Sequence, residues 1–212
     1  MRTHHGFSLI EMAVALVVVG LLLGAFALPL TSQHERLARR QTEALLHDVR
    51  EALIGYAALR GHLPCPDSST DPAHDDYGLP DTSCATGNEG FLPHRALGLT
   101  AQDAWGNRLR YRVDPAFTAP LTLSTQPHFT RGELRVGVLH EEKKQSTQQE
   151  PPVALFFSFG PNGKPDDGNT THDYRADLPT PEFDDQLAWI SRPLLYARLL
   201  TLGGLPANDV AP

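Results

Sequence analysis

A single carboxylate interrupts an apolar stretch near the N-terminus, and its chemistry depends on where the chain is cut. The stretch covers residues 7–30, and Glu11 is its one charged residue. Cleavage after Gly6 would make Phe7 the new N-terminus, with a positively charged α-amine. In a helix, Glu11 lies on the same face as Phe7. In a packed array of such helices, Glu11 of one chain can meet the amine of a neighbour, so that two buried charges compensate each other.

Two other interpretations of this stretch stay open from the sequence alone. Its 24 residues form a helix of about 36 Å at about 1.5 Å per residue, which is long enough for an uncleaved membrane anchor. Ala25-Phe26-Ala27 has the small-x-small form that signal peptidase prefers, which fits a secretory signal peptide. Neither interpretation gives Glu11 a partner. An acid in a membrane segment costs free energy and indicates a function when a partner for it can be named, as it can after cleavage at Gly6. Arg36, Arg39 and Arg40 follow the stretch, so the positive-inside rule does not favour a cytoplasmic N-terminus.

The segment GFSLIE, from Gly6 to Glu11, resembles the processing motif of type IV prepilins and type II secretion pseudopilins. The resemblance implies that a prepilin peptidase and N-methyltransferase cuts after Gly6 and methylates Phe7. It also implies that Glu11 is the acid that acts in filament assembly. The implied further partners are other pilins or pseudopilins, the inner-membrane assembly platform and membrane lipid. The size of the remaining domain favours a minor subunit.

The expected fold class is α+β, with a long N-terminal helix packed on a small antiparallel sheet. Residues 1–6 form the leader and residues 7–31 the transmembrane or filament-core helix. Residues 32–61 continue this helix as an amphipathic segment, and residues 62–212 form a β-rich domain. The resemblance places that domain in the periplasm of a bacterium, anchored to the inner membrane until it enters a filament.

Local sequence patterns predict the secondary structure of the amphipathic segment and of the domain. Alternation predicts strands at residues 108–113 and 134–139, and a short apolar run predicts another at 153–159. Ser191 is suited to cap a last helix over residues 193–202. Apolar residues at three- and four-residue spacing predict one buried helical stripe. Its members are Leu45, Val49, Ala52, Leu53, Tyr56 and Leu59.

The two cysteines, Cys65 and Cys84, lie in segments rich in proline, aspartate and serine. In an oxidising compartment they would most simply pair as a disulfide. The alternative is a metal site that also uses His62 and His74. That set has no paired Cys-x-x-Cys spacing, which weakens the metal interpretation.

Two short segments of the domain resemble those of major pseudopilins. Residues 103–107 (DAWGN) resemble their Asp-Pro-Trp-Gly segment, and residues 157–163 (FSFGPNG) resemble the Ser-Leu-Gly-Ala-Asp-Gly end of a strand. The resemblance implies that the following loop binds calcium, for which oxygen ligands are suited. The loop offers Asp166, Asp167, Asn169 and Asp173. Asn162 replaces an acid and follows a proline here, so a loop of ordinary solvated acids is the alternative.

Composition and missing motifs limit the other functions. The formal net charge is −7, and no basic stripe with interleaved aromatic residues indicates a nucleic-acid surface. The sequence contains no HExxH, GxSxG, Walker loop or GxGxxG, so nothing in it predicts an enzyme or requires a cofactor. The competing hypothesis is a binding or enzymatic domain anchored in the periplasm that does not polymerise.

Overall fold

The structure is a computed structural model that describes residues 8–84, 89–125, 135–137, 152–166, 169, 173–176, 180 and 183–204. At residues 23–32, 135–137 and 173 it describes the backbone alone. The chain divides into two compact units, Met1–Arg40 and Gln41–Pro212. The elements are α1 (Leu9–Arg60), β1 (Glu89–Phe91), α2 (His94–Leu97), β2 (Arg110–Val113), a 3-10 turn (Pro115–Phe117), β3 (Arg135–Gly137), β4 (Pro152–Ser158), β5 (Asp173–Arg175), β6 (Gln186–Ser191) and α3 (Arg192–Leu202).

The first unit contains the N-terminal part of α1. Its large apolar side chains are exposed from Leu9 to Leu22. Within the described part of the chain, no helix is both long and apolar enough to cross a membrane. The predicted membrane segment, residues 7–31, extends beyond the residues whose side chains are described.

In the second unit, the C-terminal part of α1 buries one face against the sheet, as the amphipathic pattern predicts. Val49, Leu53 and Ala57 are fully buried at a spacing of four residues. The prediction for Leu59 is wrong, because this side chain is 88% exposed. Leu59 follows Ala57 by two residues, which turns it by about 200° around the helix and away from the buried face.

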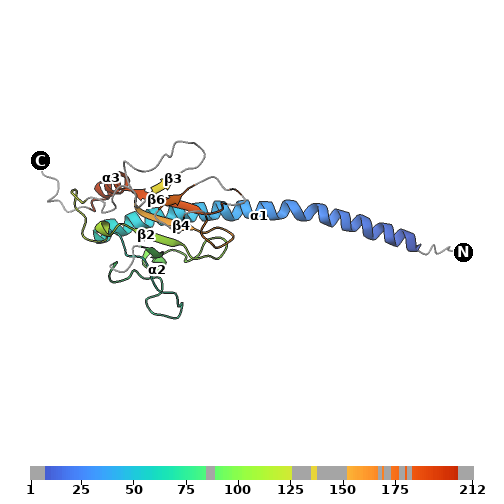
Figure 1. Ribbon diagram of the computed structural model, residues 1–212, viewed down its shortest axis with the longest axis horizontal. Helices are drawn as coiled ribbons and strands as arrows, with labels where there is room; N and C mark the ends of the chain where they lie inside the picture. Colours follow the sequence, from blue (N-terminus) through green and yellow to red (C-terminus); the bar gives the residue numbers. More distant parts are fainter. Residues whose placement is uncertain are drawn as a thin grey trace. The chain divides into compact units, whose positions relative to one another are not determined.

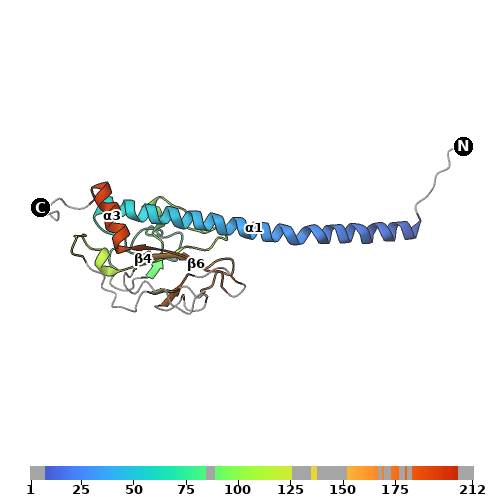
Figure 2. The ribbon, with the colours of Figure 1, turned by 90° about the horizontal axis from the view of Figure 1, so that it is seen from above.

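The main sheet has the strand order β1-β2-β4-β6, and all its neighbouring strands are antiparallel. Figures 1 and 2 show β4 and β6 alongside the C-terminal part of α1, with α3 near the end of that helix. All seven residues of β4 are buried. Phe156 belongs to the core that includes α1, whereas Phe157 packs with Tyr174 of β5 in a second cluster. The predicted α+β class is confirmed.

The predicted strands at residues 108–113 and 153–159 correspond to β2 and β4. The strand predicted at 134–139 exists as β3, but it pairs in parallel with β5 in a separate two-stranded sheet. The C-terminal helix is also confirmed as α3. Ser191 caps it by accepting a hydrogen bond from the Leu194 N–H, and Gly203 ends it in the left-handed conformation.

The segment after α1 is fixed to the domain in two ways. Cys65 and Cys84 form a disulfide, which confirms the predicted pairing and leaves neither sulfur for the alternative metal site. Asp67 is fully buried and pairs with Arg108 at 2.7 Å, and it also accepts a hydrogen bond from the Gly78 N–H at 2.8 Å. The Arg108 guanidinium lies over the Phe91 ring of β1 at 3.7 Å. The disulfide loop is therefore also held by a charged contact to Arg108, which lies just before β2.

Candidate functional site

The N-terminal motif is described from Ser8 onward, and Gly6 and Phe7 lie outside the described residues. Glu11 accepts a hydrogen bond from the Ser8 N–H at 3.2 Å, and the Ser8 hydroxyl accepts one from the Ile10 N–H at 3.4 Å. A serine followed three residues later by a glutamate forms a capping box, which satisfies N–H groups that have no partner within the helix. In the isolated chain, the Glu11 carboxylate therefore has a local partner at the first turn of α1.

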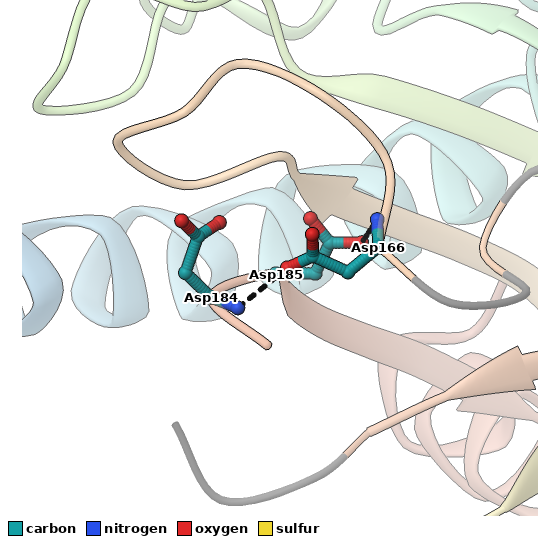
Figure 3. A group of neighbouring side chains, drawn as sticks. All are labelled: Asp166, Asp184 and Asp185. Carbon is teal, nitrogen blue, oxygen red and sulfur yellow. Dashed lines mark hydrogen bonds between the residues drawn. The ribbon is translucent and has the colours of Figure 1, made fainter. Parts of the chain in front are cut away.

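A second group of acids lies in the globular unit, where the segment after β4 meets the start of β6. Ligand oxygens of Asp166, Asp184 and Asp185 all lie within 4.8 Å of one another, and Figure 3 shows the three side chains. Asp184 and Asp185 directly precede β6, and Asp166 follows the turn that leaves β4. We call these three residues the acidic cluster.

Hydrogen bonds from backbone N–H groups to side-chain carboxylates hold the acidic cluster together. The Asp184 N–H donates to Asp166 Oδ2 at 2.6 Å, and the Asp166 N–H donates to Asp185 Oδ2 at 3.0 Å (Figure 3). The Asn169 side-chain amide donates to the same Asp185 oxygen at 2.7 Å. Because each backbone contact joins the two segments, the acids are brought close by the fold and not by one stretch of sequence.

Asp185 is the buried member of the acidic cluster. Its side chain is 5% exposed, and among the described residues its second oxygen, Oδ1, has no hydrogen-bond partner. Burial raises the pKa of this carboxyl to about 6, against the lowering by its hydrogen bonds with Asn169 and the Asp166 backbone. A buried charge costs free energy unless it is paired or bound to a metal. The three carboxylates of the cluster, Asp185 included, offer the oxygen ligands that a hard cation prefers, so the acidic cluster is able to hold a metal ion.

The acidic cluster overlaps the predicted calcium ligands only in part. Asp166 belongs to it, and Asn169 contacts it through Asp185. Asp167 lies outside the described residues, as does the side chain of Asp173. Sequence reasoning missed Asp184 and Asp185, which come eighteen and nineteen residues after Asp166. The sequence offered one signal, which is a pair of adjacent acids directly before the strand segment at residues 186–191. Acids at the start of a strand lie close to the sheet, whereas acids within a long loop are more often solvated.

Comparison with known proteins adds one finding. In a comparison with protein families, residues 1–27 match the prokaryotic N-terminal methylation motif. The comparisons with curated proteins and with solved structures find no match. The chain thus carries a prepilin-type N-terminal motif ahead of an α+β domain.

Proposed function

We propose that the chain is a minor pilin or pseudopilin, a structural subunit of a type IV pilus or of a type II secretion-like filament. The observation that carries this proposal is the methylation motif at residues 1–27, together with the long helix α1, which begins within the motif at Leu9. The packing of that helix on a four-stranded antiparallel sheet is consistent with it. The role is structural, and no catalytic residue is proposed.

The proposed sequence of steps begins at the inner membrane. A prepilin peptidase removes residues 1–6 and methylates Phe7, and residues 7–31 hold the chain in the lipid. Residues 32–61 lead to the domain at 62–212 in the periplasm. The assembly platform then moves the subunit into a filament, where other pilins or pseudopilins replace lipid around the exposed apolar side chains from Leu9 to Leu22.

Glu11 acts in assembly under this proposal. In the isolated chain its partner is the Ser8 N–H, a neutral group. In the filament its partner is the positively charged Phe7 amine of a neighbouring subunit. The amine adds the direct attraction of a full positive charge, which is large where the surroundings have a low dielectric constant, so the exchange favours assembly. The alternative function, an anchored binding or enzymatic domain that does not polymerise, gives Glu11 the capping role alone.

The processed N-terminus is the direct test of the proposal. When the full chain is co-expressed with a prepilin peptidase and extracted from membranes, intact mass and N-terminal sequencing should show a chain that starts at N-methylated Phe7. Matched cells without the peptidase should retain Met1. A start at Leu28 in both would mean that signal peptidase uses Ala25-Phe26-Ala27, and the subunit proposal would be wrong.

We also propose that the acidic cluster binds calcium. The proposal is supported by the unpartnered Oδ1 of buried Asp185 and by the oxygen-only donors around it. A bound ion would join the segment after β4 to the start of β6. A ligand that binds only the folded state stabilises it by about 2.7 kcal/mol at about 100 times its dissociation constant. For a domain of this size, that corresponds to roughly 5 to 10 °C in melting temperature.

We therefore expect calcium to raise the melting temperature of the full chain in detergent, and chelation to reverse the rise. Asp185→Asn should remove most of the difference. Without calcium, this variant should melt no lower than the unaltered chain, because it loses a buried charge that has no cation. Asp75→Asn, which removes an exposed acid, is the matched control and should keep the calcium effect. If the unaltered chain has the same melting temperature with calcium and with chelator, the proposal that the cluster binds calcium is wrong.

A further inference from the structure

Between β4 and the acidic cluster the chain makes a turn that a second segment holds in place. The turn contains Gly160 and Gly163, and both have φ near +60°. A Cβ on Gly160 would lie 2.7 Å from the backbone oxygen of Asp184, so the turn and the cluster are in direct contact. Only glycine tolerates both this backbone conformation and this closeness.

The segment that holds the turn is the loop at residues 103–107. The buried Asp103 organises this loop, since its Oδ1 accepts hydrogen bonds from the N–H groups of Trp105 and Asn107 at 2.9 and 2.8 Å. Its Oδ2 accepts from the Ser158 hydroxyl at 2.5 Å, and that hydroxyl accepts from the Gly160 N–H at 3.0 Å. The loop is thus fixed to the end of β4.

Asn107 reaches from this loop to the turn. Its side-chain amide donates to the Gly160 carbonyl at 2.7 Å, and a Cβ on Gly163 would lie 2.9 Å from its Oδ1. Asn107 therefore touches the turn at both glycines. Asp166 follows Gly163 by three residues, and its own carboxylate and N–H close onto Asp184 and Asp185.

We propose that Asn107 is a positioning residue for the ion site in the acidic cluster. It does not touch the ion. It fixes the turn that contains Gly160 and Gly163. Asp166 follows this turn toward the other two acids, and Asp184 packs against it. The inference rests on the proposed calcium site and adds to it a residue that lies 59 positions before Asp166 in the sequence. Residues that hydrogen-bond directly to metal ligands typically change metal affinity by about 10- to 100-fold when they are removed, and Asn107, which acts one step further out through the turn, is expected at the lower end of this range.

The test is calcium titration of the full chain in detergent, by calorimetry with calcium chloride as the probe, beside melting curves in chelator. Asn107→Ala should weaken calcium binding by about 10-fold or more. Asn107→Asp keeps the size of the side chain but places an oxygen opposite the Gly160 carbonyl, so it should weaken binding as well. Thr118→Ala is the matched control, because it removes a side-chain hydrogen bond to the Pro115 carbonyl in a different turn. It should leave the affinity unchanged.

The two measurements separate positioning from plain structural support. A structural role would lower the melting temperature in chelator and leave the dissociation constant of the folded protein unchanged. That result, or wild-type affinity in Asn107→Asp, would overturn the inference while the calcium site stands. If the unaltered chain binds no calcium, the ion site and this role of Asn107 are both wrong.

Discussion

A chain that carries Glu11→Leu should insert and fold like the unaltered chain, yet fail to join filament subunits. Removal of the carboxylate takes away a group that costs free energy in the membrane, so insertion should be at least as good. The globular unit begins at Gln41 and should keep its melting temperature. In assembly, the Phe7 amine of the neighbour would be buried without a partner. Breaking a buried pair in this way costs about 3 to 5 kcal/mol, or roughly a 150- to 5,000-fold loss of association.

The measurement is cross-linking or co-purification with the other filament subunits at matched membrane levels. Glu43→Leu, which changes an exposed acid further along α1, is the control and should be recruited normally. Glu11→Gln helps to separate the two roles of the residue, because glutamine can complete the capping box but carries no charge. Equal recruitment of Glu11→Leu and the unaltered chain would favour the anchored domain that does not polymerise.

Loss of the disulfide should destabilise the globular domain by about 3 kcal/mol, the chain-entropy value for a loop of about this length. Cys65 and Cys84 are separated by 19 residues. Asp67 and Arg108 also hold this loop in the folded state, so the double variant Cys65→Ser/Cys84→Ser should keep the native arrangement. The effect then comes mainly from the greater freedom of the unfolded chain. Denaturant titration of the oxidised chain and the double variant measures the difference, and equal midpoints would show that the bond contributes nothing.

The elements that could be predicted from the sequence are those with a local signal. The spacing of Val49 and Leu53 indicated a buried helical face, and Ser191 and Gly203 marked the two ends of α3. β4 was recognisable as a continuous apolar run. β1 could not be found in this way, because it has three residues and depends on its register with β2, where Gly90 lies opposite Tyr111.

The candidate sites differ in the same respect. Gly6, Phe7 and Glu11 form a motif within six residues, so their proposed roles follow from the sequence alone. The acidic cluster could not be predicted from the sequence, because its members come from two segments. The fold brings these segments together where the loop after β4 meets the start of β6. Asp184 and Asp185 became candidates only when their distance to Asp166 and the burial of Asp185 were known.

The place of β4 in the sheet has a consequence for the order in which a new chain can fold. β4 lies between β2 and β6, and β6 ends at Ser191, 33 residues after the end of β4. At about 5 to 20 residues per second, synthesis leaves the apolar edge of β4 open for roughly 2 to 7 s after β2 has paired with it. Such an edge is a template for pairing with other chains. A chain that ends before β6 would retain this edge permanently, so incomplete chains should be removed by quality-control proteases and should not persist as shortened subunits.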